Sequence, residues 1–351
     1  MNNILIVSLH FSPGYIGHMM AWYKLCKQCG YKPLIYGDEQ YSKYYDNSEY
    51  EFTTKKENLE LYKPEYAIVQ NTGFENVEFF KWCRKNRCKI LYILHEPYMG
   101  VKELLKDGTY CIKQAVACIL NVWLCKKSER VIVCSQYAED NCRRYMKGTY
   151  KKASRFPLLF MDEYSDEGEE RKYFSLVGTF ATPKGSDLFL KFIKESVNKG
   201  CDINFQIATR TNLDEQLKDE TLQQLIRNGK LIVQHGRNMT TDEINAAYRR
   251  SICCWNGYRR TTQSGVLPNA YMLGTPVLAT MLGSFVEFVV PGKTGEFIDN
   301  EDTDSIYNAY LKIREYSEEM SRQCRQYFLD HFFYGNQVKE FISIIDSIQH
   351  R

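Results

Sequence analysis

The chain has 351 residues, of which 46 are Lys or Arg and 43 are Asp or Glu, so its formal net charge is +3. This length exceeds that of a typical domain of about 100–200 residues, and two domains, each with its own core, are expected. This net charge does not by itself suggest a nucleic-acid partner, and none is expected. No apolar run approaches the roughly 20 residues needed to span a bilayer.

The first elements along the chain are typical of an α/β domain. An apolar run with β-branched residues at 4–9 is followed by a loop at 10–17 and by a helical segment at about 18–29. The start of the chain lacks the basic and then apolar layout of a signal peptide. Because the 13 cysteines are also scattered and odd in number, we expect a reduced, cytoplasmic protein.

Further short apolar runs alternate with helical segments and predict a buried parallel sheet. The expected strands are 32–36, 66–70, 90–94 and 130–134, and the expected helices include 77–86 and 110–125. The segment 110–124, with Lys126 and Lys127 beyond it, has an apolar face. A helix that covers the sheet explains this face, and contact with a membrane interface is the alternative.

The composition turns acidic at 162–172, where we expect the boundary between a first domain at 1–165 and a second at 172–330. A second alternation of strands and helices begins there and predicts another Rossmann-like domain. Its expected strands are 173–177, 204–208, 230–234, 251–255 and 276–279, and its helices are 186–198, 213–227 and 241–249, followed by two final helices at about 304–327 and 334–350.

Two short motifs resemble metal sites but have simpler structural explanations. Cys26 and Cys29 form a C-x-x-C pattern within an expected helix, and no second pair follows at metal-ligand spacing. Buried thiols are therefore favoured over a zinc or redox site. Asp302 and Asp304 form an Asp-x-Asp pattern directly before an expected helix, so N-capping is favoured over metal binding, and we expect no essential metal.

The segment 258–280 places basic side chains, a Ser-Gly turn, a helix and a buried strand in that order. Ser264 and Gly265 stand where the helix is expected to begin. Unpaired N–H groups at the helix start, the helix dipole, and the preceding Arg259 and Arg260 predict a site for a diphosphate. An ordinary helix, turn and strand without a ligand is the alternative.

This segment and its continuation resemble the C-terminal half of GT-B glycosyltransferases of glycosyltransferase family 4, also called group 1. In that family the nucleotide-sugar helix runs into Gly-Thr-Pro-Val, as at 274–277, and then into Gly-Gly-x-x-Glu and Pro-Gly-x-Thr-Gly, as at 283–287 and 291–295, with Ser284 in place of the second glycine. The resemblance implies the GT-B fold. Two Rossmann-like domains would face each other across a cleft, and a C-terminal helix at about 332–351 would return to the first domain.

The resemblance also implies a retaining, metal-independent hexosyltransferase. Such an enzyme moves a sugar from a nucleotide-diphosphate sugar to a glycan or lipid-linked glycan acceptor, here in polysaccharide biosynthesis, and needs no cofactor beyond its donor. It would be cytoplasmic or peripheral at the inner face of the membrane. Family members are thought to need no protein nucleophile, because the leaving diphosphate helps to deprotonate the acceptor, so catalysis rests on positioning and on stabilising that leaving group.

In the first domain the resemblance indicates three residues. Gly17 matches the second glycine of Phe-x-Pro-x-x-Gly-Gly, and without a Cβ it would let the loop approach the donor phosphates. His95 follows an apolar strand, where open α/β sheets bind ligands, and it matches a histidine that contacts the donor sugar. Ser135 matches a serine that ends a family strand. A plain turn at Gly17 and a surface pair of His95 with Glu96 are the alternatives.

In the second domain, Gly178 and Lys184 match the motif Gly-Arg-x-x-x-x-Lys-Gly, whose basic residues bind the diphosphate. Thr179 replaces the arginine of this motif. Arg210 or Arg259 is therefore expected to supply the missing charge.

The family also has two glutamates eight positions apart, and here Thr261 and Asn269 occupy these positions. Asn269 can still hydrogen-bond ribose hydroxyls, and Thr261 with Gln263 can reach a sugar hydroxyl, but none of them can act as a base. A subset of the family carries Thr-Gln-Ser-Gly-Val, as this chain does at 262–266. Gly236 matches a glycine that lies near the nucleotide base.

The predicted catalytic residues are therefore Lys184, His95 and Arg259. The predicted donor-binding residues are Gly17, Ser135, Gly178, Thr179, Arg210, Gly236, Arg260, Thr261, Gln263, Ser264, Gly265, Val266 and Asn269, and no metal ligand is predicted. Because three motif residues are replaced, a catalytically silent nucleotide-sugar-binding partner protein is the main alternative. A GT-B sugar-nucleotide epimerase is the weaker one, since that chemistry would want acid and base carboxylates.

Overall fold

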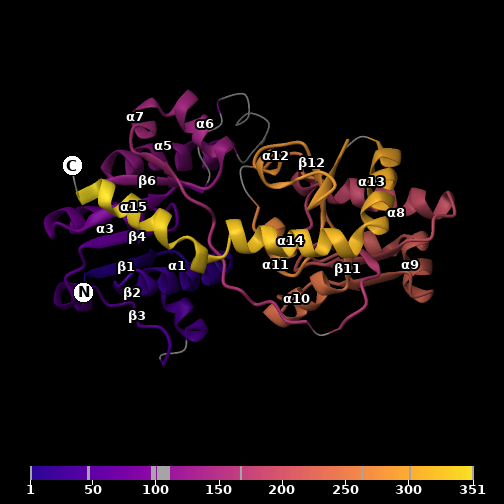
Figure 1. Ribbon diagram of the computed structural model, residues 1–351, viewed down its shortest axis with the longest axis horizontal. Helices are drawn as coiled ribbons and strands as arrows, with labels where there is room; N and C mark the ends of the chain where they lie inside the picture. Colours follow the sequence, from indigo (N-terminus) through magenta and orange to yellow (C-terminus); the bar gives the residue numbers. More distant parts are fainter. Residues whose placement is uncertain are drawn as a thin grey trace. The chain divides into compact units, whose positions relative to one another are not determined.

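The computed structural model describes residues 2–45, 48–95, 100, 111–166, 168–261, 264–299 and 302–349, and for 111–114 only the backbone. The chain divides into two compact units, Met1–Met161 with His331–Arg351, and Asp162–Asp330 (Figure 1). In the described part of each unit, helices connect the strands of a parallel sheet. This arrangement confirms the predicted α/β class.

The sheet of the first unit has seven strands in the described residues, in the order β3-β2-β1-β4-β5-β6-β7, and all neighbouring strands are parallel. They are β1 (Asn3–Ser8), β2 (Lys32–Gly37), β3 (Phe52–Thr53), β4 (Tyr66–Val69), β5 (Lys89–Ile93), β6 (Arg130–Val133) and β7 (Ala153–Arg155). The strands that the apolar runs predict are present. The edge strands β3 and β7 escape prediction because they are very short and partly exposed.

The helices of the first unit agree with the predicted ones where predictions exist. They are α1 (Ile16–Gln28), α2 (Lys56–Tyr62), α3 (Glu75–Lys85), α5 (Cys111–Lys127), α6 (Gln136–Tyr145), α7 (Lys147–Tyr150) and α15 (Val338–Gln349), with 3-10 turns η1 (Pro13–Tyr15), η2 (Glu39–Tyr44) and η6 (Tyr334–Asn336). Cys26 is buried in α1, and all cysteines whose side chains are described are free thiols. No helix among the described residues is long and apolar enough to cross a membrane.

The C-terminal helix α15 belongs to the first unit, as the resemblance implies. Arg130 Nη2 donates to Ser347 O at 3.1 Å, and Gln349 Nε2 donates to the Tyr66 hydroxyl at 3.1 Å, so α15 lies beside β4 and β6 (Figure 1). The ring of Phe341 packs edge-on against Trp22 of α1, with ring centroids 5.6 Å apart. These contacts fix the helix to the sheet near the amino ends of the strands.

The sheet of the second unit has six strands in the described residues, in the order β10-β9-β8-β11-β12-β13, and it is again parallel. The strands are β8 (Tyr173–Val177), β9 (Asn204–Ala208), β10 (Leu231–Gln234), β11 (Ser251–Asn256), β12 (Val277–Thr280) and β13 (Gly295–Ile298). The sequence pattern predicts all but β13, which begins within the Pro-Gly-Lys-Thr-Gly segment.

Two predicted helices of the second unit differ from the observed ones. The helix expected at 213–227 begins only at Glu220, because the Asp219 carboxylate caps it by accepting from the N–H groups of Thr221 and Leu222. The helix expected at 304–327 is interrupted at Tyr316. The helices are α8 (Ser186–Asn198), α9 (Glu220–Arg227), α10 (Thr241–Arg249), α11 (Val266–Met272), α12 (Phe285–Phe288), α13 (Thr303–Glu315) and α14 (Ser317–His331), with 3-10 turns η4 (Thr182–Lys184) and η5 (Gln216–Lys218).

Asp302 is the N-cap of α13, as the sequence predicts. Its Oδ1 accepts a hydrogen bond from the Asp304 N–H at 2.9 Å, and the Asp304 carboxylate forms an ion pair with Lys199. Both carboxylates therefore have structural partners. Within the described ranges no group of three or more His, Cys, Asp or Glu side chains is arranged to hold a metal ion.

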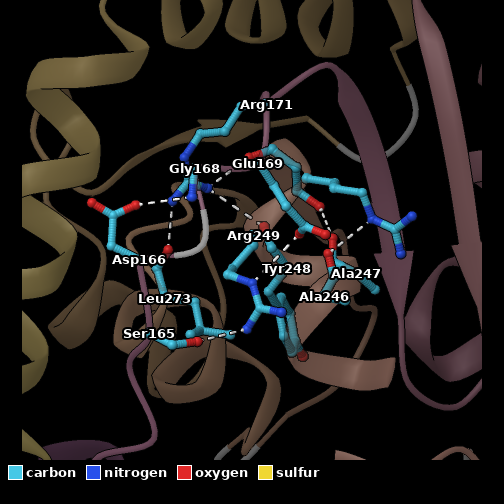
Figure 2. A network of polar contacts seen from close by, with 12 residues as sticks. Ser165, Asp166, Gly168, Glu169, Arg171, Ala246, Ala247, Tyr248, Arg249 and Leu273 are labelled. Carbon is cyan, nitrogen blue, oxygen red and sulfur yellow. Dashed lines mark hydrogen bonds and ion pairs between the residues drawn. The ribbon is translucent and has the colours of Figure 1, made fainter. Parts of the chain in front are cut away.

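The half-buried guanidinium of Arg171 contacts Tyr248 at the end of α10 and Leu273 at the end of α11 (Figure 2). Its Nη1 donates to Ser251 O and Thr275 Oγ1 at 2.9 Å, and its Nη2 donates to Leu273 O at 2.5 Å. Leu273 is the C-cap of α11, so Arg171 satisfies a carbonyl that the helix leaves unpaired. Gly274 follows at φ +68°, where a Cβ would lie 2.5 Å from Ser321 Oγ. These contacts set the position of α11 against the sheet.

Candidate functional site

The residues that follow β8 carry the first part of the predicted donor site. Gly178 has φ of +112°, and a Cβ there would lie 3.3 Å from Val266 Cγ2. The start of α11 therefore packs closely over the end of β8, and a side chain at Gly178 would be strained in both backbone and packing. Thr179, at the position where the family has arginine, is exposed.

The turn at Lys184 packs closely against the end of β11. Lys184 ends η4, and Gly185 follows at φ +68°, where a Cβ would lie 1.9 Å from Gly257 O. Only glycine allows this approach. Trp255 Nε1 donates to Lys184 O at 3.1 Å and fixes the turn to the strand.

Tyr258 connects the Lys184 turn with the segment before α11. The Lys184 ammonium nitrogen lies 3.9 Å from the centroid of the Tyr258 ring, within the range of a cation–π interaction. The Tyr258 hydroxyl lies 3.1 Å from Ser264 Oγ. Burial raises the pKa of Tyr258, so the phenol stays neutral and keeps its proton for hydrogen bonding. The structure thus brings Lys184 and Ser264 together through Tyr258, which is not among the predicted site residues.

Arg259 fastens the same turn. Its Nη1 and Nη2 donate to Asp187 Oδ1 and Oδ2 at 2.6 and 2.8 Å, and Nη1 also donates to Thr182 O at 2.9 Å. The hydrogen bonds from Arg259 lower the pKa of Asp187, which stays ionised. The predicted phosphate ligand therefore has its guanidinium directed to a carboxylate on α8.

Gly265 is the N-cap of α11, and Ser264 directly precedes it. The helix spans seven residues, from Val266 to Met272, so basic side chains rather than a long helix would have to supply most of the attraction for an anion. Asn269 lies half-buried in the second turn. Gln263 lies outside the described residues.

Thr261 is buried, with 8% of its surface exposed, and its carbonyl oxygen lies against the turn at Gly283. A Cβ on Gly283 would lie 2.0 Å from Thr261 O, and Gly283 has φ of +54°. The glycine that the family retains in this turn is therefore required by a close approach. Arg260, beside Thr261, is half-buried.

Arg210 and Gly236 follow β9 and β10, and both are exposed. Gly236 has φ of +76°, and its N–H donates to Thr211 O at 3.2 Å. Because the sheet is parallel, these two residues and the residues after β8 and β11 all lie at its carboxyl edge. The predicted second-domain residues that the structure describes are therefore distributed along one edge.

The predicted residues of the first unit lie near the carboxyl ends of β1, β5 and β6. Gly17 lies in the first turn of α1, and an added Cβ would meet nothing within 4 Å, so no packing contact requires glycine there. Ser135 is the N-cap of α6, where its Oγ accepts from the Ala138 N–H at 3.1 Å. This cap gives Ser135 a structural role.

His95 follows β5 and is half-buried. Burial lowers the pKa of His95 to about 3, with a smaller contribution from His18, so its imidazole is neutral. Its ring lies 5.0 Å from that of Tyr15, centroid to centroid. A neutral imidazole can donate and accept hydrogen bonds but brings no charge to the site. Glu96, its alternative partner, lies outside the described residues.

Two further residues at strand ends are absent from the predicted site. Gln70 directly follows the central strand β4, Asn256 is the last residue of the central strand β11, and both are fully buried. Neither carboxamide has a hydrogen-bond partner for its oxygen or its nitrogen among the described residues. In the sequence, each of these residues is a carboxamide at the end of an apolar run. This pattern indicates a site only when the end of the strand is known to be buried, which the sequence does not show.

Residues 171–315 match the family model described as Glycosyl transferases group 1. This match covers most of the second unit and contains the Lys184 turn, Tyr258 and α11. The chain is thus similar to group 1 glycosyltransferases in the unit that carries these residues. No significant match exists among curated protein sequences.

Solved structures resemble the chain over its whole length. A glycosyltransferase from Rickettsia africae ESF-5 has a TM-score of 0.73 at 11% identity, covering 99% of this chain and 98% of that one. Anabaena Alr3699/HepE in complex with UDP has a TM-score of 0.72 at 12% identity, with coverage of 99% and 100%. Sucrose-phosphate synthase from Thermosynechococcus elongatus has a TM-score of 0.78 at 12% identity, with both chains covered completely. At these identities the likeness establishes the fold, which is GT-B.

Proposed function

We propose that the chain is a retaining, metal-independent glycosyltransferase. It moves a sugar from a nucleotide-diphosphate sugar to a glycan or lipid-linked glycan acceptor, in polysaccharide biosynthesis. The match of residues 171–315 to group 1 glycosyltransferases and the GT-B fold support this reaction class.

The observation that carries the proposal is the arrangement of Lys184, Tyr258 and Ser264. The ammonium of Lys184 lies over the Tyr258 ring at 3.9 Å, and the Tyr258 hydroxyl is 3.1 Å from Ser264 Oγ, immediately before α11. A cation and two hydroxyls therefore lie close together near the carboxyl edge of the sheet. Such a combination suits a diphosphate.

The chemistry follows from the charge that develops on the leaving group. As the bond from the sugar to the diphosphate breaks, negative charge grows on the departing oxygens, and a fixed ammonium at Lys184 interacts more strongly with them than with the intact donor. Arg259 contributes by holding the turn through Asp187 and the Thr182 carbonyl. Because the leaving diphosphate can accept the acceptor proton, no protein base is required in this scheme.

His95 is proposed to contact the donor sugar. Its low pKa of about 3 keeps the imidazole neutral at physiological pH. A neutral ring can both accept from and donate to sugar hydroxyls. Its contribution would therefore be orientation of the sugar rather than proton transfer.

A uridine diphosphate sugar is the first donor to test. The structural neighbour from Anabaena has been crystallised with UDP, with UDP and glucose, and with UDP-glucose. The sequence identity of 12–13% to this neighbour does not carry base or sugar over to this chain, so the panel of donors has to include other bases.

A catalytically silent nucleotide-sugar-binding protein is the second candidate. Two observations favour it, and the first is that neither Thr261 nor Asn269 offers a carboxylate where the family has its glutamates. Arg259, moreover, is engaged by Asp187. Both functions need the same donor site and differ only in turnover.

Peripheral contact with the membrane is proposed through α5. Val116 and Ile119 on this helix are 42% and 71% exposed, whereas Leu120 and Leu124 are buried against the sheet. Lys126 and Lys127 follow in the last turn. Flotation with vesicles of acidic phospholipid would test this contact, and equal flotation of a variant with Val116→Ser and Ile119→Ser would refute it.

The function is tested by a panel of nucleotide sugars, with thermal shift for binding and release of free nucleoside diphosphate for turnover. The proposal predicts stabilisation by one donor and release of its diphosphate, faster with a glycan or lipid-linked acceptor present. Stabilisation without turnover in the presence of acceptors would favour the silent binder. A protein that responds to no nucleotide would refute the donor site itself.

A further inference from the structure

Asn256 is the last residue of β11 and is fully buried, with 0% of its surface exposed. Both its Oδ1 and its Nδ2 lack a hydrogen-bond partner within the part of the chain that the structure describes. Burying a carboxamide without partners is costly, and native proteins satisfy such groups by an ordered water or a ligand. The residue therefore requires an explanation.

The position of Asn256 in the sheet is the place where open α/β sheets bind ligands. The chain runs from β8 outward to β10 on one side and from β11 outward to β13 on the other, so β8 and β11 flank the switch point of the sheet. Ligands of such sheets bind outside the carboxyl ends of these strands. Asn256 pairs in register with Ala279 of β12 and stands at that end of β11.

The carboxamide faces the side of the sheet that α11 covers. Successive side chains of a strand alternate between its faces, and Trp255 packs into the cluster that includes Phe189 of α8. Asn256 therefore points to the opposite face. Val266 of α11 closes over the end of the adjacent strand at Gly178, so the carboxamide lies beside the segment that the predicted donor site occupies.

A second buried carboxamide in the same sheet has hydrogen-bond partners within the protein, as a structural residue does. Gln206 of β9 is 2% exposed, and its Nε2 donates to Ala247 O at 3.0 Å and lies 3.4 Å from Ser175 Oγ. The fold thus supplies partners to the amide nitrogen of the carboxamide that lies away from the strand ends. It leaves unsatisfied, among the described residues, the one that lies at the switch point.

The first unit repeats this arrangement independently. Gln70 directly follows β4, which lies beside β1 at the switch point of that sheet, and it is also fully buried. Neither its Oε1 nor its Nε2 has a partner in the described ranges. Among the described residues, Gln70 and Asn256 are the two buried carboxamides in which both polar atoms lack a partner, and both stand at a switch point.

We propose that Asn256 is a positioning residue of the donor site, which holds a polar group of the nucleotide sugar at the carboxyl edge of the second sheet. The inference rests on the proposed function for the identity of the ligand. Because the side chain has no exposed surface, one enclosed water between the carboxamide and the donor is the expected form of the contact. The role is independent of Lys184 and of the helix start.

The test compares Asn256→Leu, which keeps the number and branching of the side-chain heavy atoms and removes both polar atoms, with Gln206→Met as the matched control. Asn256→Leu should melt at the same temperature as the wild type or higher, while its dissociation constant for the donor that best stabilises the wild type rises roughly tenfold. Gln206→Met should melt lower and retain donor affinity. Asn256→Ser, which keeps a polar group and room for water, should lose less affinity than Asn256→Leu.

Each outcome supports or overturns the role of Asn256 in donor binding. If Asn256→Leu weakens binding of the free nucleoside diphosphate, the contact is with the nucleotide. If it weakens binding of the intact nucleotide sugar only, the contact is with the sugar. An Asn256→Leu protein that binds as the wild type does overturns the inference and leaves the proposed function standing. The inference is also overturned if both Asn256→Leu and Asn256→Ser lower the melting temperature as Gln206→Met does, because this would reveal a structural partner of Asn256. Absence of nucleotide binding by the wild type would overturn the proposed function first.

Discussion

Arg259 and Asp187 form a bidentate ion pair, with Nη1 to Oδ1 at 2.6 Å and Nη2 to Oδ2 at 2.8 Å. The pair joins the segment after β11 to the first turn of α8, on the two sides of the Lys184 turn. The two side chains are 40% and 53% exposed, so water screens the pair and its contribution to stability is about 1 kcal/mol or less. Its main consequence is geometric, because it limits where Lys184 can lie.

The ion pair leads to a prediction that separates two roles of Arg259. If Arg259 fastens the turn, Asp187→Asn weakens donor binding although Asp187 is itself an anion near the proposed diphosphate. If Arg259 instead binds the phosphates directly, removing its carboxylate partner would release it and raise donor affinity. We expect weaker binding in calorimetry, with a melting temperature close to that of the wild type.

Lys184→Ala should reduce turnover by about 10²–10³-fold, because a fixed cation at the departing oxygens is removed. The fold should stay intact, since the ammonium contacts the face of Tyr258 and lies at the surface turn η4. Lys191→Ala is a matched control, as Lys191 is an exposed lysine of α8 that pairs with Glu195. An undiminished rate of diphosphate release by Lys184→Ala would refute the proposed role.

Tyr258 is expected to act on the donor through Lys184. Tyr258→Phe keeps the ring under the ammonium and loses only the hydrogen bond to Ser264, whereas Tyr258→Leu loses both. The Leu variant should raise KM for the donor by about twofold to thirtyfold, which corresponds to a cation–π interaction of roughly 0.5–2 kcal/mol, and the Phe variant should change it less.

Tyr271→Phe is the control for Tyr258, because Tyr271 is equally buried and its hydroxyl donates to Thr294 Oγ1 at 2.8 Å, away from Lys184. It should lower the melting temperature and leave KM unchanged. Equal KM values for Tyr258→Leu and the wild type would show that donor binding by the Lys184 ammonium does not require the Tyr258 ring.

Much of the fold follows from the sequence because its strands are buried on both faces. Such strands read as continuous apolar runs, as at β4 (Tyr66–Val69) and β12 (Val277–Thr280), and the alternation with helices then indicates parallel sheets. The edge strand β13 contains Gly295 and Glu296 and lacks this signal. This strand owes its conformation to its pairing with β12, so the run of residues alone does not identify it.

The site was predictable only in part. Motif register indicates Lys184 and Ser264, and the structure brings both to Tyr258. The partner of Arg259 is not predictable, because Asp187 comes near only when Gly185 lets the turn approach Gly257. The enclosed state of Asn256 depends in the same way on tertiary packing.

Two histidines of the first unit make its stability depend on pH. Burial lowers the pKa of His95 to about 3 from 6.5, and burial also lowers the pKa of His18, so the unfolded chain binds protons at these residues that the folded chain does not. Their contribution to stability is therefore complete above about pH 6.5 and falls progressively as the pH drops toward 3. Denaturant unfolding between pH 7 and pH 4 should show this decline. His95→Gln should flatten it, and the double variant with His18→Gln should flatten it further. A decline in His95→Gln as steep as in the wild type would mean that His95 titrates alike in both states, and its neutral role in orienting the sugar would then lose its basis.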